Sequence, residues 1–156
     1  IMDGYDKKWA NRKKSNQAEG IFESYLDLKG IEYVKCGIDA IERNLPGLRY
    51  VSDFVRCQPD YLVFKEIKKP IFVEVKGFAN FIKLKPKDLR SYIQWKDYHP
   101  VWLFMYNLKD DTRCMASIDK VCNVIRMRKP EIKHYPESQK NTYYEMPPSW
   151  FNFEPI

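Results

Sequence analysis

The sequence predicts a single α/β domain in which helices pack on a mixed β-sheet. Four short apolar runs have the length and composition of strands: 31–38, 61–64, 71–76 and 101–106. Two segments, 15–29 and 86–98, carry apolar residues at helical spacing. The resulting order is helix, strand, linker, strand, strand, helix, strand. A chain of 156 residues has the size of one domain with its own core.

The ends of both predicted helices are marked by suitable residues. The first helix can use Ser15 or Asn16 as its N-cap, and Gly30 is placed to end it in the left-handed conformation. The second helix begins at Pro86, because proline is favoured at the first helical position.

The region between the first two strands and the region after the last one are harder to assign. Pro46 and Gly47 mark a turn, with a short helix expected before it and an extended segment expected at 48–55. Residues 113–129 fit a strand followed by a helix, but the pattern alone does not decide this assignment.

We expect three parts along the chain. Residues 1–14 form a basic arm, either solvated or in contact with phosphates. Residues 15–129 form the core. Residues 130–156 form a tail rich in proline and aromatic residues, which we expect to lie irregularly over the core and to pack its Trp and Phe side chains on it.

Composition excludes some classes of protein. No run approaches the ~18 apolar residues of a membrane span, so no membrane partner is expected. The cysteines form no CxxC pair, and neither histidine lies near them at zinc-ligand spacing. We expect the four cysteines, Cys36, Cys57, Cys114 and Cys122, to be buried and reduced. Reduced thiols favour a cytoplasmic location. The net charge of +6 is compatible with a polyanionic partner but does not establish one.

Residues 59–77 predict a β-hairpin with an unusual register. If residues 65–69 form the loop, Phe64 lies opposite Pro70 and Leu62 lies opposite Phe72. A proline at the start of a strand is tolerated, because that residue need not donate to the ladder.

The same register places charges together on one face of the hairpin. Asp60 would face Glu74, with their Cβ atoms roughly 5 Å apart, and Lys76 would share that face. A cross-strand salt bridge would explain Lys76 and one carboxylate but not the second. Two carboxylates so close call for a proton or a cation between them, and Mg²⁺ or Mn²⁺ accepts such oxygen ligands. These are the groups needed for metal-assisted attack on a phosphodiester.

The motif resembles the PD-(D/E)XK signature of the restriction-endonuclease-like nuclease superfamily. Its residues here are "PD" at 59–60 and "EVK" at 74–76. The resemblance covers about residues 15 to 106 and implies a restriction-endonuclease-like core. It also implies that Asp60 and Glu74 bind the metal and that Lys76 acts on the attacking water.

Two further residues have both a functional and a structural interpretation. Glu19 matches a metal-side glutamate of this superfamily, and its helix resembles that of phage junction-resolving endonucleases. With Asn16 as N-cap, Glu19 could instead close a capping box. Gln94, with Tyr98 four residues on, resembles the QxxxY element of some superfamily nucleases, but a glutamine on an exposed helix face is the commoner case.

Basic residues near the predicted site are candidates for binding DNA, although a solvated surface would explain each of them singly. The candidates are Lys83, Lys85, Lys87 and Arg90 after the motif, and Arg43, Arg49 and Arg56, with Tyr50 for stacking, before it.

The resulting prediction is a metal-dependent DNA endonuclease, directed to junctions or other branched DNA and, by its resemblance to phage enzymes, phage-encoded. An exonuclease or recombination nuclease with the same site, or a binding module that does not cut, are the alternatives. A homodimer is expected on the ground that cutting both strands needs two sites.

Overall fold

A six-stranded mixed sheet forms the centre of the structure, a computed structural model that describes residues 17–38 and 46–156. Its strand order is β1-β2-β3-β5-β6-β9. Every neighbouring pair is antiparallel except β3 and β5, which are parallel. The strands are β1 (Glu32–Lys35), β2 (Tyr61–Phe64), β3 (Ile71–Phe78), β5 (Val101–Asn107), β6 (Thr112–Ser117) and β9 (Glu154–Pro155).

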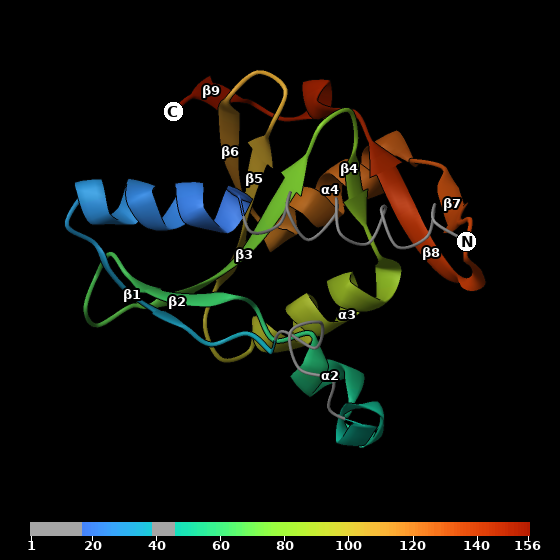
Figure 1. Ribbon diagram of the computed structural model, residues 1–156, viewed down its shortest axis with the longest axis horizontal. Helices are drawn as coiled ribbons and strands as arrows, with labels where there is room; N and C mark the ends of the chain where they lie inside the picture. Colours follow the sequence, from blue (N-terminus) through green and yellow to red (C-terminus); the bar gives the residue numbers. More distant parts are fainter. Residues whose placement is uncertain (1–16, 39–45) are drawn as a thin grey trace.

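The two faces of this sheet are covered differently. The N-terminal helix, described over residues 17–28, covers one face. The other face is covered by helices α3 and α4 and by a second sheet of order β4-β8-β7 (Figure 1). The elements on this side are β4 (Ile82–Leu84), α3 (Pro86–Trp95), α4 (Ile118–Arg128), β7 (Ile132–Tyr135) and β8 (Ser138–Met146).

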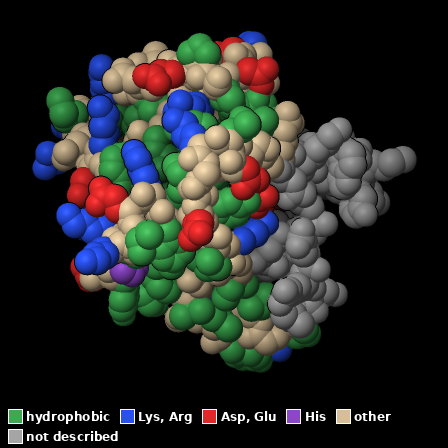
Figure 2. Space-filling model, turned by 90° about the vertical axis from the view of Figure 1, so that its left-hand side faces the viewer, with side chains coloured by type: hydrophobic (Ala, Val, Ile, Leu, Met, Phe, Trp, Pro, Cys, Tyr) green, Lys and Arg blue, Asp and Glu red, His purple; other side chains and the backbone are tan. Residues whose placement is uncertain are grey.

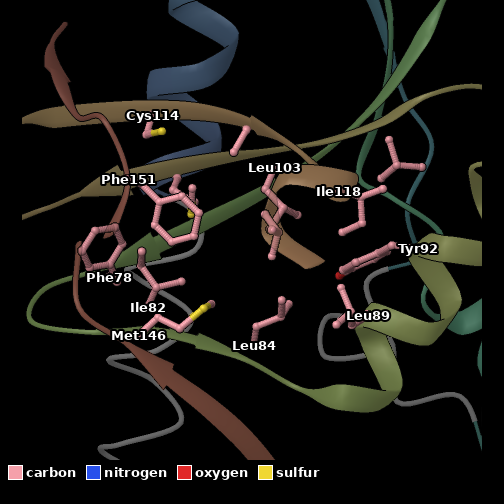
Figure 3. Packing of buried hydrophobic residues seen from close by; sticks show 14 of the residues in the cluster. Phe78, Ile82, Leu84, Leu89, Tyr92, Leu103, Cys114, Ile118, Met146 and Phe151 are labelled. Atoms are coloured by element: carbon pink, nitrogen blue, oxygen red, sulfur yellow. The ribbon is translucent and has the colours of Figure 1, made fainter. Parts of the chain in front are cut away.

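Strand β3 contributes to a separate core on each side, because alternate side chains of a strand point to opposite faces. Val73 and Val75 pack with Phe22 and other residues under the N-terminal helix. Phe72 and Phe78 belong to the larger core on the other side. Figure 3 shows side chains of β3, β4, β5, β6, β8, α3, α4 and the C-terminal tail converging in this larger core.

The predicted end of the first helix and the predicted start of the second are confirmed, whereas α3 ends at Trp95 and not at residue 98, and the expected N-cap, Ser15 or Asn16, lies outside the described residues. Gly30 has φ of 65°, and the amide of Ile31 donates to the carbonyl of Leu26 at 3.0 Å, which closes the helix end. Pro86 occupies the first turn of α3. Residues 113–129 do contain a strand followed by a helix: Ser117 caps α4 by accepting a hydrogen bond from the amide of Lys120 at 3.2 Å.

The prediction of an extended segment at 48–55 is wrong. The chain instead forms a 3₁₀-helix, η1 (Pro46–Tyr50), and a short helix, α2 (Asp53–Arg56). Ser52 caps α2, and Phe54 stacks on Trp95 of α3 with ring centroids 4.3 Å apart. This tertiary contact, which local sequence does not reveal, favours the helical form.

The tail is also more regular than expected. Strands β7 and β8 pair with each other, and β8 pairs with β4. After the 3₁₀-helix η2 (Pro148–Trp150), Phe151 and Phe153 pack on the larger core, as expected for the aromatic residues of the tail.

All four cysteines are free, as predicted, but Cys114 alone is fully buried and the other three are half-buried. Within the described ranges, no helix combines the length and the apolar character needed to cross a membrane. The arm of residues 1–14, the expected helix before Pro46 and Arg43 lie outside the described residues.

The packing of the tail predicts a large effect of truncating Phe151, which is 6% exposed. Phe151→Ala should destabilise the protein by about 3–5 kcal/mol, because it removes a buried ring and leaves a cavity. Thermal or urea unfolding measures this. Phe81→Ala is the matched control: Phe81 is 45% exposed and should cost far less. Equal effects of the two variants would contradict the packing described.

Candidate active site

The hairpin register predicted from the sequence is confirmed. Leu62 pairs with Phe72, and Tyr61 pairs with Val73. Backbone pairing of β2 with β3 ends at Tyr61 and Val73. At the next two residues, Asp60 and Glu74, side chains rather than backbone hydrogen bonds connect the two segments.

Asp60 and Glu74 are linked through reciprocal hydrogen bonds. The backbone amide of Asp60 donates to Oε2 of Glu74 at 3.2 Å. The amide of Val75 donates to Oδ2 of Asp60 at 2.9 Å. Each carboxylate therefore accepts an amide from the partner strand, which fixes both where β2 and β3 separate.

Lys76 and Tyr92 complete the surroundings of Glu74. The Nζ atom of Lys76 lies 3.4 Å from Oε1 of Glu74. The hydroxyl of Tyr92, on α3, lies close enough to the same carboxylate to partly offset the rise in its pKa. Glu74 is only 8% exposed, whereas the side chain of Lys76 keeps 25% of its surface open to solvent. The opening of the site is therefore on the side of Lys76.

The main chain of Asp60 is held by the segment that follows β1. The amides of Cys36 and Gly37 donate to the carbonyl of Asp60 at 2.8 and 3.1 Å. A Cβ atom at Gly37 would lie 3.0 Å from Cα and 3.2 Å from Oδ1 of Asp60. Any other residue at this position would require Asp60 to shift by a few tenths of an ångström.

Burial and mutual repulsion set the protonation of the two carboxylates. Burial raises the pKa of Asp60 well above its ordinary value, and the negative charge of Glu74 raises it further. Burial also raises the pKa of Glu74, although Lys76 and the Tyr92 hydroxyl partly offset this effect. Both shifts favour binding of a proton or another cation.

The pKa of Lys76 is raised, although its burial alone would lower it. Burial alone would lower the pKa of Lys76, but the carboxylates of Glu74, Asp88 and Asp60 more than offset it and raise the pKa above the ordinary lysine value. Lys76 is therefore an ammonium group at neutral pH. It can donate hydrogen bonds and offset negative charge, but in this state it cannot accept a proton.

Glu19 approaches from the other face of the sheet. Its Oε2 atom accepts a hydrogen bond from Nζ of Lys35 at 2.9 Å, and its charge contributes to the raised pKa of Asp60. The structure thus brings Glu19 to the vicinity of Asp60, paired with a lysine. The alternative capping box depends on Asn16, which lies outside the described residues.

Two residues of α3 that the sequence analysis did not select belong to the site. Asp88 and Tyr92 are four residues apart, so they share one face of the helix. The charge of Asp88 acts on both Glu74 and Lys76. Cys57 donates to Oδ1 of Asp88 at 3.3 Å, which connects α3 to the segment before β2. The sequence signal that could have identified Asp88 and Tyr92 is their spacing of four residues in the helix that begins at Pro86.

Gln94 is not brought to this group. It is exposed on α3, two residues and so about 200° around the helix from Tyr92. Tyr98 is 65% exposed and packs on Phe54 and Trp95.

The basic residues predicted to bind DNA are more scattered. Lys83 lines a pocket together with Lys76. Lys85 precedes α3, and Lys87 and Arg90 lie on it, with Arg90 exposed. Arg49 is exposed on η1, where its guanidinium lies 4.8 Å from the ring centroid of Tyr50. Arg56 of α2 is ion-paired with Asp53.

The donor set suits a hard divalent cation held by few protein ligands. Among the described residues, no three His, Cys, Asp or Glu side chains form a group that could hold a metal ion by themselves. Asp60 and Glu74 supply two carboxylates, and Mg²⁺ bound by one or two carboxylates completes its shell with water. The raised pKa values of both groups fit a cation in this place.

Comparison with known proteins supports the fold. No family model and no curated protein matches the chain. Several solved structures are similar, and two of them come from nucleic-acid enzymes. One is Hjc of Archaeoglobus fulgidus, a Holliday junction resolvase from an archaeal hyperthermophile, with a TM-score of 0.52 and 9% identity, over 88% of this chain and 87% of that one. The other is D212, a nuclease from a fusselovirus, with a TM-score of 0.51 and 14% identity, over 93% of this chain and 86% of that one.

At these identities the similarity concerns the fold. The chain is a single mixed α/β domain with the fold of a junction resolvase and a viral nuclease. This agrees with the PD-(D/E)XK resemblance of residues 59–60 and 74–76.

The electrostatics of the site predict that Asp60→Asn stabilises the metal-free protein. The raised pKa of Asp60 means that the folded chain binds more protons than the unfolded chain between pH 4 or so and the folded pKa. Wild-type stability therefore falls as the pH rises through this window. Asp60→Asn, which keeps an oxygen for the amide of Val75, should gain about 1–2 kcal/mol at pH 7 and much less at pH 4.

Urea unfolding in EDTA at several pH values measures this difference. Asp97→Asn, a change at an exposed aspartate, is the control and should leave the pH dependence unaltered. A variant at position 60 that is less stable than wild type at every pH would show that the carboxylates do not repel each other.

Proposed function

We propose that the protein is a metal-dependent nuclease that hydrolyses phosphodiester bonds in DNA. The observation that carries the proposal is the pair of buried carboxylates, Asp60 and Glu74, fixed at a strand end beside the ammonium group of Lys76. A buried repulsive pair costs stability, and a structural salt bridge would not need the second carboxylate. A fold shared with a resolvase and a nuclease supports the same function.

Each residue has a distinct role in this proposal. Asp60 and Glu74 would hold Mg²⁺ or Mn²⁺, and the bound ion would supply Lewis-acid stabilisation of charge on the phosphate. Lys76 positions the attacking water and offsets negative charge on the phosphate oxygens. Tyr92 orients Glu74 through its hydroxyl.

Glu19 is assigned a supporting role. Its carboxylate would help to bind cations near Asp60 once Lys35 releases it. The two residues lie where the N-terminal helix meets the end of β1. The pair thus provides a carboxylate that is available without being buried unpaired in the free protein.

We further propose branched DNA as the substrate and a homodimer as the active form. One structural neighbour is named as a Holliday junction resolvase, and cutting both strands requires two sites. Lys83, Lys85, Lys87 and Arg90 would neutralise phosphates beside the site, with Arg49 at a second edge. We do not include Gln94, because it is exposed and turned away from Tyr92. The free cysteines are compatible with a reducing cytoplasm, where we place the activity.

Cleavage of a substrate panel tests the proposal. Supercoiled, linear, single-stranded and four-way-junction DNA are incubated with Mg²⁺ or with EDTA. Cutting should require Mg²⁺, and Lys76→Ala should lower the rate constant by about 10²–10³-fold, because it removes one charged transition-state contact. Lys68→Ala, at an exposed residue of the β2–β3 turn, is the control. Equal cutting by Lys76→Ala, or no cutting of any DNA, would refute the nuclease proposal.

Metal binding can be tested without catalysis. Mn²⁺ or Mg²⁺ at about 100 times its dissociation constant should stabilise the wild-type protein by ~2.7 kcal/mol, because it binds only the folded state. Asp60→Asn and Glu74→Gln should each lose most of this gain, and Asp97→Asn should retain it. Thermal unfolding with and without the metal measures the effect. Equal metal-dependent gains in all four proteins would place the ion elsewhere.

A further inference from the structure

The small sheet has one face in the core and one face that is free of the core. Ile82 and Leu84 of β4 and Met146 of β8 are buried in the larger core. Lys83, between the first two, points to the opposite face, where it pairs across the strands with Glu145. The alternation of β4 therefore leaves its odd-numbered residues on the outer face.

This outer face alternates lysines with aromatic rings. The Nζ atom of Lys83 lies 5.0 Å from the ring centroid of Tyr143, and that of Lys85 lies 5.4 Å from the ring centroid of Tyr135. The two tyrosine rings are 4.5 Å apart, centroid to centroid. Lys133 of β7 reaches Glu145 at 3.0 Å. The contacts connect all three strands into one continuous strip.

The strip extends to the active site at two points. A pocket of about 330 Å³ is lined by residues 76–83 and Glu145, and Phe81, which is one of the lining residues, is 45% exposed. At the other point, Tyr135 lies close enough to Lys76 and Asp88 for their charges to act on it. Lys76 is thus shared by the active site and the pocket.

The two sides of the molecule differ in the charges they carry. The side of the N-terminal helix mixes Lys and Arg with Asp and Glu side chains (Figure 2). The outer face of the small sheet carries Lys83, Lys85 and Lys133, with Glu145 paired to Lys133 and with Glu131 and Glu137 near its edge. Its charge suits a polyanion, and its rings suit a ligand that offers flat apolar surfaces.

We propose that this outer face, formed by Phe81, Lys83, Lys85, Lys133 and Tyr135, binds a single-stranded segment of DNA adjoining the bond that is cut. The proposal rests on the nuclease function and specifies its substrate as DNA with unpaired bases. The lysines bind phosphates, and the half-exposed rings of Phe81 and Tyr135 stack on bases. Tyr143, 7% exposed, supports Lys83 from below.

A duplex would use this face poorly. Paired bases are stacked inside the double helix, so a duplex presents phosphates and sugars to the rings. A single strand can place a base against each ring, and one such stacking contact is worth a five-fold change in affinity or more. The pocket beside Lys76 gives room for a base that leaves the stack.

Binding to labelled oligonucleotides in EDTA tests this inference. The probes are an oligothymidylate of about 16 nucleotides and a duplex of the same length. Phe81→Leu and Tyr135→Leu should each weaken single-strand binding about five-fold or more and change duplex binding less than about two-fold. Phe81→Tyr and Tyr135→Phe, which keep the ring, should restore the affinity.

A matched control and a salt titration make the test decisive. Tyr98→Leu removes an exposed ring from the turn that follows α3 and should have no effect. Lys83→Ala should reduce the slope of log Kd against log salt concentration by ~0.7 for the single strand; this readout remains if Tyr135→Leu fails to fold.

Two results would overturn the inference. One is unchanged single-strand affinity in both leucine variants, and the other is duplex binding as tight as single-strand binding. Because EDTA prevents cleavage, either result leaves the nuclease proposal standing. Conversely, if Lys76→Ala cuts DNA as fast as the wild type, the nuclease proposal is refuted, but the measured single-strand binding is unaffected.

Discussion

Two carboxylates are held against each other at the point where strands β2 and β3 separate. Hydrogen bonding alone does not remove their repulsion: each accepts an amide from the opposite strand, yet the pKa of each stays raised. The surrounding layers hold them there. The core on each face of β3 fixes the strand, Gly37 admits the chain that holds Asp60, and Tyr92 reaches Glu74 from the crossover helix. The packing around the two carboxylates holds them in place.

The parts of this site that could be predicted are those set by local pattern. The short turn after Phe64 fixes the register of β2 and β3, and a period of two then places Glu74 and Lys76 on one face. Asp88, Tyr92 and Gly37 depend on how α3 and the segment after β1 pack, which no local pattern encodes. Strands β7 and β8 were missed for a related reason. With one face outward they are rich in polar residues, and the partner of β8, β4, lies more than fifty residues earlier in the chain.

Fold and chemistry support the functional conclusion independently. The two structural neighbours are 9% and 14% identical to this chain, so they support the fold and not the chemistry. Catalysis is inferred from particular atoms: two carboxylates that accept amides from opposite strands, and one ammonium, paired with Glu74, that stays charged beside them. The outer face of the small sheet adds a second candidate DNA-binding surface, which neither the sequence motif nor the fold comparison predicts.

The ends of the six-stranded sheet have a consequence for solubility. Edge strands offer unpaired amides and carbonyls to other chains, and proteins limit this with short strands, charges and proline. Strand β9 has two residues, and one of them is Pro155, which has no amide to donate. Strand β1, at the other edge, is four residues long and carries charged Glu32 and Lys35 at its ends. Sheet-to-sheet aggregation is thereby disfavoured at both edges.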